Sequence, residues 1–209
     1  MQLKKYILTL AVAFAAASSS SAQYKEPEKK EKVDIFYPEV AFDSLQAKKM
    51  LAKGNAVIKG VAYTKPKTKL GYSAPFAPRI YANKMTVVLL PVTPYVEEWY
   101  RLRKDKENIR KGRFVYLSKD AYKYRLEAIT NSDGEFTFPD MLPGKYFLQG
   151  LLDYTYKGTY NAYTGTGYNS YGGQTDYYQQ KQYSKDMQDR IEEFIEVKEN
   201  GEIVKVKLH

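Results

Sequence analysis

The feature that most constrains this chain is a run of short strands and tight turns at residues 124–152, YRLEAITNSDGEFTFPDMLPGKYFLQGLL. Asp133-Gly134 and Leu142-Pro143-Gly144 predict tight turns that reverse the chain, so that the strands on either side pair as β-hairpins. The strands themselves show the two-residue period of a half-buried sheet, at Tyr124–Thr130, Glu135–Phe138 and Lys145–Leu152. This pattern favours antiparallel sheet over a helical bundle.

Strands are also predicted outside this run. Met85–Val92 is almost continuously apolar, as in a strand with both faces buried. Ala56–Tyr63 is rich in β-branched residues, and Gly60 within it suggests a bulge. The other predicted strands are an edge segment at Ile35–Val40, a short strand at Arg113–Leu117, and the pair Ile191–Lys198 and Ile203–Leu208, joined by a hairpin turn at Glu199-Asn200-Gly201. About seven strands with short turns predict a mainly β, antiparallel sandwich.

Two helices interrupt this β pattern. Asp43 suits the N-cap of a short helix that Gly54 ends. Thr93 and Pro94 suit the N-cap and first residue of a second helix, which we expect to end at Gly112. The second helix lies in a segment rich in lysine and arginine.

The order of these segments resembles the carboxypeptidase regulatory-like module, also described as transthyretin-like. The resemblance rests on a strand of the form GVAY, on TVVLLPVT, and on AITNSDGEFTFPDMLPGKYFLQG, and it covers about residues 54–155 and 190–209. Its most specific part is a strand ending in a threonine, a D-G turn, an aromatic-x-aromatic strand and L-P-G-x-Y, here Thr130, Asp133-Gly134, Phe136-Thr137-Phe138 and Leu142-Pro143-Gly144-Lys145-Tyr146.

The resemblance implies an antiparallel seven-stranded β-sandwich without catalytic activity, a folding, spacing or interaction module found in bacterial envelope proteins. No carboxypeptidase catalytic domain accompanies it, so no peptidase activity is implied. The chain departs from the minimal pattern by a basic, helical insertion at about 93–123 and a Tyr/Gly-rich insertion at 154–186. We therefore predict a signal peptide at 1–22, a charged linker and short helix at 23–53, and the sandwich with its insertions at 54–209.

The first 22 residues have the layout of a cleavable secretion signal. Lys4 and Lys5 precede a short apolar run, Tyr6–Ala17, and small residues follow up to Ala22. The apolar run is shorter than the roughly 20 residues that a membrane-spanning helix needs, and no later stretch is long and apolar enough. We expect an exported protein without a membrane span, located in the periplasm, at the outer membrane or outside the cell of a Gram-negative bacterium.

The composition argues against catalysis. The chain has no cysteine, and its single histidine is the last residue, His209. This excludes disulfides, thiolate nucleophiles, histidine-based triads and histidine metal clusters. A calcium loop ending near Asp133 would need a ligand where Ile129 stands. We predict no catalytic residue, no metal and no cofactor; an enzyme of unknown type is the remote alternative.

Positive charge is concentrated in one segment. Residues 101–125 hold ten Lys or Arg against three Asp or Glu, in a chain of net charge +9. Such a patch attracts polyanions, which for an exported protein are acidic glycans, lipopolysaccharide head groups or acidic proteins. We expect no nucleic-acid partner, because no recognised binding motif accompanies the patch. A solvated helix face is the alternative interpretation.

Aromatic residues adjoin these cations on the predicted helix. Rings beside cations can stack on sugars or dock an acidic partner. The alternative is that Trp99, the only tryptophan, packs the helix onto the sheet. The candidate contact residues in this segment are Tyr95, Trp99, Tyr100, Arg101 and Arg103.

Residues 153–183 contain nine of the 21 tyrosines together with five glycines. Three interpretations are open: disorder, a long irregular β-ribbon that turns at Gly172-Gly173 or Thr164-Gly165, and a recognition surface. The last two are compatible. Because predicted strands anchor the segment at both ends, we interpret it as an extended, partly mobile ribbon and as the place where we expect a partner to bind. Its candidate contact residues are Tyr160, Tyr163, Tyr168 and Tyr171.

Two functions from different classes follow. The first is a non-catalytic accessory or scaffold module that binds another envelope protein through its insertions. The alternative is a glycan-binding module that uses its Tyr, Trp and Arg surface. The expected partner is therefore an envelope protein or an acidic glycan, and the sequence leaves its identity and the oligomeric state open.

Overall fold

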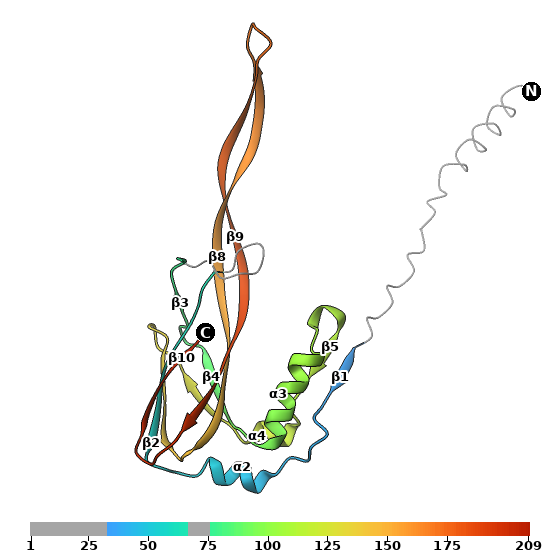
Figure 1. Cartoon of the computed structure of the whole chain (residues 1–209). Coiled ribbons are helices and arrows are strands. Elements are labelled where there is room, and N and C mark those ends of the chain that lie inside the picture. Colours follow the sequence, from blue (N-terminus) through green and yellow to red (C-terminus); the bar gives the residue numbers. More distant parts are fainter. Residues whose placement is uncertain (1–32, 67–75) are drawn as a thin grey trace, which may run out of the picture. The chain divides into compact units, whose positions relative to one another are not determined.

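The computed structural model describes residues 33–66 and 76–209. The predicted signal peptide and most of the charged linker lie outside the described residues, as does part of the loop predicted before Asn83. The described chain is mainly β, and its strands form two four-stranded sheets and one two-stranded sheet (Figure 1). No helix among the described residues combines the length and the apolar character needed to cross a bilayer.

The first four-stranded sheet is built around β2. Strand β7 pairs with β2 in antiparallel fashion, β3 pairs with the C-terminal end of β2, and β10 pairs with β2 in parallel. The parallel pair departs from the predicted antiparallel sandwich, because the chain reaches β10 from the other sheet. The strands are β2 (Ala56–Thr64), β3 (Ile80–Tyr81), β7 (Glu135–Met141) and β10 (Ile203–Leu208).

The second four-stranded sheet has the order β6-β4-β8-β9, and all its pairs are antiparallel. Strand β4 is apolar on both faces: Val87 and Leu89 belong to one core and Leu90 to another, as the sequence predicted. The strands are β4 (Thr86–Pro91), β6 (Leu126–Ile129), β8 (Gly144–Tyr168) and β9 (Gln174–Val197).

Side chains from both four-stranded sheets form the main core. Ile58, Phe136 and Phe138 come from the first sheet, and Leu89 and Leu148 from the second; all are almost fully buried. Burial of these large apolar side chains is the main source of stability for a chain without disulfides.

Tyr146, the tyrosine of the L-P-G-x-Y string, is fully buried in this core. Its hydroxyl donates to the carbonyl of Leu142 at 2.8 Å and lies 3.0 Å from the carbonyl of Met50. The motif thus ties the turn before β8 to the end of helix α2, Ser44–Met50.

The three predicted hairpins are wrong. Strands β6 and β7, joined through Gly134, lie in different sheets, and so do β7 and β8, and β9 and β10. Each turn carries the chain from one four-stranded sheet to the other. The turn residues predicted the chain reversal, but the strand partner depends on which apolar faces meet across the core. Gly134 does take the expected positive φ, +76°.

Gly60 does not form the predicted bulge. It pairs in register with Phe136 and with Val206, and the register shift in β2 lies between Ala56 and Ile58 instead. A Cβ at position 60 would lie 2.2 Å from the ring of Phe136. The glycine is therefore explained by the space that this ring occupies.

A second core covers the other face of the β4–β8 region with helices and short strands. Thr93 caps α3, Pro94–Lys106, and accepts a hydrogen bond from the Val96 N–H. Helix α3 ends at Lys106, before Gly112, which instead follows the short 3-10 helix η1 with φ +66°. The remaining elements are α4 (Lys119–Lys123), η1 (Ile109–Lys111) and the parallel pair β1 (Asp34–Phe36) and β5 (Arg113–Val115).

Helix α2 begins as predicted, because the Asp43 carboxylate accepts hydrogen bonds from Leu45 N (2.9 Å) and Gln46 N (3.0 Å). It ends at Met50, before Gly54. A Cβ at Gly54 would lie 2.1 Å from the Met141 carbonyl oxygen, so this glycine allows a close backbone approach to β7.

The Tyr/Gly-rich segment forms a β-ribbon, as one of the three interpretations predicted. Strands β8 and β9 remain paired from Gly144↔Val197 to Tyr168↔Gln174, with a bulge between Tyr163 and Gly165. Pairing of β8 with β4 stops at Gly150, so residues 153–188 continue as a two-stranded ribbon (Figure 1). It turns at Gly172-Gly173, where Gly172 has φ +81°.

Candidate binding site

Helix α3 carries five candidate contact residues, and the structure separates them. Tyr95, Trp99 and Arg103 are at most 5% exposed and belong to the packing between the helix and the second sheet. Tyr100 is half-buried, and Arg101 points to solvent beside Glu98. Trp99 packs onto the second sheet against Phe147, as the alternative interpretation of this residue predicted.

Arg103 is the centre of the polar contacts beneath the helix. Its guanidinium donates to Gln149 Oε1 at 2.7 Å and forms an ion pair with Glu192. Gln149 and Glu192 are register partners on β8 and β9, so Arg103 bridges the two strands. The guanidinium also lies 4.5 Å from the ring centre of Trp99 and 5.1 Å from that of Tyr100.

These charges stabilise one another in a partly buried setting. Burial lowers the pKa of Arg103, and the negative charge of Glu192 opposes that shift. Burial alone would raise the pKa of Glu192, but hydrogen bonds from Lys104 and Arg103 and their positive charges bring this pKa below its usual range. The hydrogen bond to Glu192 raises the pKa of Lys104. All three groups are therefore charged at neutral pH.

The basic segment is partly neutralised by the fold. Arg103 and Lys104 share Glu192, and three more cations of residues 101–125 have acidic partners within 4.0 Å. Those three are Arg101 with Glu98, Lys123 with Asp120, and Arg125 with Glu127. The basic patch that the sequence predicts to attract polyanions is thus divided into ion pairs at these residues.

Beside Arg103 lies a cleft of about 480 Å³ between the helical layer and the second sheet. Its apolar part includes Val88, Leu90 and Val115. The aromatic residues along it are Tyr37, Trp99, Tyr116 and Tyr122, and the polar ones are Arg103, Glu107, Lys119, Gln149 and Arg190. Arg190 is held by Glu107 through an ion pair at 2.5 Å.

The indole N–H of Trp99 is buried and has no hydrogen-bond partner among the described residues. An unpaired buried donor costs about 1–3 kcal/mol, so a residue of this kind calls for a physical explanation. Trp99 itself lines the cleft.

Several residues of the cleft were not among the sequence candidates. Glu107, Gln149 and Arg190 come from three elements and meet only in the folded chain. One signal was present for Gln149, which is polar in an otherwise apolar stretch of β8. No sequence pattern linked it to Arg103, 46 positions away.

The four candidate tyrosines of the ribbon are exposed and do not form one cluster. Tyr160 lies below the bulge, Tyr163 packs edge-on against Tyr178 at 5.9 Å, and Tyr168 and Tyr171 lie at the turn. Their exposed fractions run from 50% for Tyr160 to 96% for Tyr171. Along the paired strands β8 and β9 they lie at least eleven residues from Gln149, the residue of β8 that lines the cleft, and none of them lines the cleft with Trp99.

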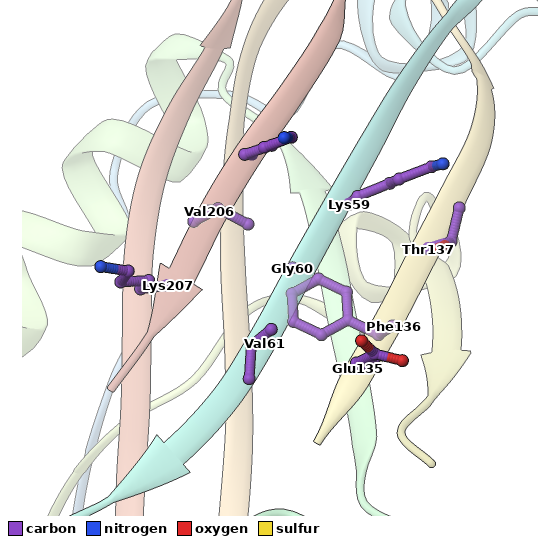
Figure 2. Close-up of a pocket in the computed structure, with 9 residues that line it drawn as sticks. Lys59, Gly60, Val61, Glu135, Phe136, Thr137, Val206 and Lys207 are labelled. Carbon is purple, nitrogen blue, oxygen red and sulfur yellow. The ribbon is translucent and has the colours of Figure 1, made fainter. Parts of the chain in front are cut away.

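A trough of about 510 Å³ crosses the outer face of the first sheet (Figure 2). Lys59 and Lys205 are register partners on one side of it, with Val61 and Lys207 on the other. The ring of Phe136 is turned into the core and is 4% exposed. Lysines along the edge strand β10 are a common protection against strand pairing, and the trough offers no exposed ring, so we favour the cleft as the binding site.

No cluster of three or more potential metal-ligating side chains occurs within residues 33–66 and 76–209. The Asp133 loop is explained by its turn: Asn131 Oδ1 accepts hydrogen bonds from the N–H groups of Asp133 and Glu135.

Comparison with known proteins gives a likeness of fold. No family model matches the chain, and no curated protein matches it in sequence. A crystal structure from Pseudomonas aeruginosa, of a protein named as a "putative carbohydrate binding protein", superposes with a TM-score of 0.52 at 18% sequence identity. The match covers 83% of this chain and 99% of that one. At this identity the likeness concerns the fold alone.

Proposed function

We propose that this protein is a non-catalytic glycan-binding module and that the cleft beside α3 holds the glycan. The observation that carries the proposal is the aromatic-lined cleft, in which Trp99, Arg103 and Gln149 lie together with two exposed tyrosines, Tyr116 and Tyr122. This glycan-binding function was the alternative hypothesis from the sequence, and the geometry of the cleft now favours it over the first.

The chemistry of the cleft suits a sugar. A pyranose has C–H faces that pack on aromatic rings and hydroxyls that both donate and accept hydrogen bonds. Tyr116 and Tyr122, each 47% exposed, offer rings, while Gln149 and Arg190 offer planar polar groups. A volume of about 480 Å³ lies within the usual size of small-molecule sites. The named function of the Pseudomonas aeruginosa protein supports the same class of ligand.

We further assign the two four-stranded sheets to the transthyretin-like, carboxypeptidase regulatory-like architecture. Seven longer strands, with the two-residue β3 added, support this assignment. Export to the cell envelope is part of the proposal and rests on the signal-like residues 1–22. Cleavage after Ala22 in the secreted protein, measured by N-terminal sequencing, is the corresponding test.

Trp99 provides a direct test of glycan binding, because it is the only tryptophan. Glycans selected on an array are titrated against the whole chain while its fluorescence is followed. Binding in the cleft should change the emission. Trp99→Phe keeps a ring but reduces the aromatic surface that lines the cleft, and calorimetry should show a roughly tenfold weaker affinity. Tyr100→Phe, which removes a hydroxyl on the same helix outside the cleft, should bind normally.

Two outcomes contradict the cleft as the glycan site. One is a glycan that binds without changing the Trp99 emission. The other is a folded Trp99→Phe variant that binds the glycan as tightly as the unaltered chain.

A protein partner is the second candidate function, and the free edge of β9 favours it. Among the described strands, β9 is the last of its sheet and pairs only with β8 over residues 174–197, so within residues 33–66 and 76–209 its other edge has no partner strand and could accept an added strand. A specific envelope partner should then be lost when residues 155–185 are replaced by a short turn, and retained in Trp99→Phe.

A further inference from the structure

The ribbon has two chemically different faces. Even-numbered residues of β8 pair with odd-numbered residues of β9, so Tyr154, Tyr156 and Tyr160 share a face with Tyr183 and Met187. We call this the aromatic face. The opposite face below the bulge is polar, with Thr155, Lys157, Thr159 and Asn161 from β8 and Gln180, Gln182, Ser184 and Asp186 from β9.

The rings of the aromatic face form a continuous stripe. Tyr183 lies 6.2 Å from the ring centre of Tyr156 and 6.2 Å from that of Tyr160. It can occupy this central position because Gly158 stands opposite: a Cβ there would lie 2.7 Å from the Tyr183 ring. Successive side chains on one face of a strand are about 7 Å apart, so the stripe presents rings at regular intervals along the ribbon.

The stripe is anchored at its base. The Asp189 carboxylate accepts hydrogen bonds from Thr64 at 2.6 Å and from Tyr154 at 3.3 Å, which ties the ribbon to the end of β2. Below this point the same face is covered by the first sheet and forms the main core, where Leu148, Leu152 and Ile191 are buried. Above it the aromatic face is more open: Tyr156 and Tyr183 are half-buried and Tyr160 is 50% exposed.

Charge is also divided between the faces. Lys181 pairs across the ribbon with Tyr160, and Lys185 with Tyr156, so both lysines lie on the aromatic face. No acidic residue lies on that face between Tyr154 and Ala162 or opposite them. Neither lysine has an ion-pair partner among the described residues. The acids Asp153 and Asp186 lie on the polar face.

We propose that the aromatic face of the ribbon binds an acidic polysaccharide chain, with Tyr156, Tyr160 and Tyr183 stacked on pyranose rings and Lys181 and Lys185 paired with carboxylate or sulfate groups. The inference rests on the proposed glycan-binding function and adds a second site with its own ligand class. It is separate from the cleft, which includes Gln149 and Arg190 on the opposite face of β8 and β9.

Charge and composition favour a polysaccharide over a protein at this face. Rings with unpaired cations and no acid complement a negatively charged chain. Protein interfaces are enriched in arginine and depleted of lysine at their centres, whereas here both cations are lysines placed between tyrosines. Tyrosine also offers a rigid ring at a small cost in side-chain entropy, which suits stacking on a repeating ligand.

The test uses the whole chain and three polymers, compared by affinity electrophoresis and by calorimetry at several salt concentrations. Polygalacturonate carries carboxylates, dextran sulfate carries sulfates, and unmodified dextran is neutral. We expect binding to at least one anionic polymer and not to dextran. Lys181→Gln/Lys185→Gln should weaken it roughly 3- to 30-fold and reduce its salt dependence.

A second variant tests the rings, and two controls test the location. Tyr160→Ser/Tyr183→Ser should weaken binding at high salt as well, because stacking is not screened. Lys157→Gln removes one cation from the opposite face and should bind as the unaltered chain does. Trp99→Phe changes the cleft and the packing beneath α3, not the aromatic face, and should leave polymer binding unchanged. Circular dichroism establishes that each variant is folded.

Three results would overturn the inference. The first is no binding to either anionic polysaccharide. The second is an equal loss in Lys157→Gln and in the double lysine variant, which would indicate general charge attraction. The third is equally tight binding of poly-L-glutamate with the same dependence on the lysines and tyrosines, which would assign the face to an acidic polypeptide. Glycan binding reported by Trp99 emission can succeed or fail independently of all three.

Discussion

Gly60→Ala should destabilise the protein, although alanine is usually the better residue in a strand. Gly60 lies in the middle of β2, in register with Phe136, and the added Cβ would stand 2.2 Å from the Phe136 ring. The ring is 4% exposed and packs edge-on against Phe138, so it has little room to move.

The magnitude follows from two opposing effects. Removing backbone freedom from the unfolded chain should stabilise by about 0.5–1 kcal/mol. Forcing an extra carbon against a packed ring costs about 1–3 kcal/mol. We expect a net loss of about 1–2 kcal/mol in the free energy of unfolding, or roughly 2–8 °C in Tm for a chain of this size.

The matched control is Gly158→Ala on the ribbon. Its Cβ would also meet a ring, that of Tyr183 at 2.7 Å, but this ring is partly exposed and can swing into solvent. We expect no loss of global stability from this change. The same added methyl group should therefore lower the free energy of unfolding where the facing ring is fixed and leave it unchanged where the ring can move.

Chemical denaturation of four proteins measures the effect: the unaltered chain, Gly60→Ala, Phe136→Leu and the double variant. Gly60→Ala should cost less in the Phe136→Leu background, with a coupling of about 1 kcal/mol. The reasoning is refuted if Gly60→Ala is as stable as the unaltered chain, or if its cost is the same in both backgrounds.

Three further predictions concern stability. Glu192→Gln should lower the free energy of unfolding by about 2–3 kcal/mol at pH 7, because Arg103 loses its ion pair. The pKa of Glu192 lies below its unfolded value of about 4.3, so this contribution is complete above that pH and is lost as pH falls through the folded pKa. Denaturation curves of the variant and the unaltered chain should therefore converge in acid, and a constant separation would contradict the prediction. Gly134→Ala should lower the stability measured by thermal melting by at least about 2 kcal/mol, because φ is +76° and a Cβ would lie 2.3 Å from the Ala62 carbonyl oxygen. Gly172→Ala has a similar φ of +81° but no atom within 4 Å, so it should cost no more than about 1–2 kcal/mol. Equal costs would contradict the role of the contact with Ala62. Tyr146→Phe should lower the free energy of unfolding by about 1–2 kcal/mol through loss of the hydrogen bond to Leu142. Burial raises the pKa of Tyr146, so its stabilising contribution is present below the unfolded pKa of about 10 and falls as pH rises above it. Denaturation at pH 9–11 should therefore show a weaker pH dependence in Tyr146→Phe than in the unaltered chain.

Much of the local structure of this chain can be predicted from its sequence. Strand periods, the Asp43 and Thr93 caps and the positive φ of Gly134 all depend on residues within a few positions of one another. Such features follow from backbone sterics and nearby hydrogen bonds, which act in the same way wherever the segment lies. Both faces of β4 were predicted to be buried for the same reason, because every residue along it is apolar or β-branched.

The candidate contacts in α3 show where local reasoning ends. Trp99 and Arg103 were recognised as an aromatic beside a cation, but the sequence did not determine whether they face solvent or the sheet. Their surroundings come from Gln149 and Glu192, which lie 46 and 89 positions from Arg103. The cleft exists only because these segments meet.

The sequence by itself determined where strands, caps and reversals occur, while the tertiary structure decided which strands pair. Turns at Gly134, Gly144 and Gly201 reverse the chain, yet each leads into the opposite sheet, and β10 runs parallel to β2. The physical reason is that a turn fixes direction over a few residues, whereas the partner of a strand is selected by burial of its apolar face against side chains from distant segments. The same long-range burial places the Trp99 ring beside Arg103, while Tyr160 on the aromatic face of the ribbon stays 50% exposed.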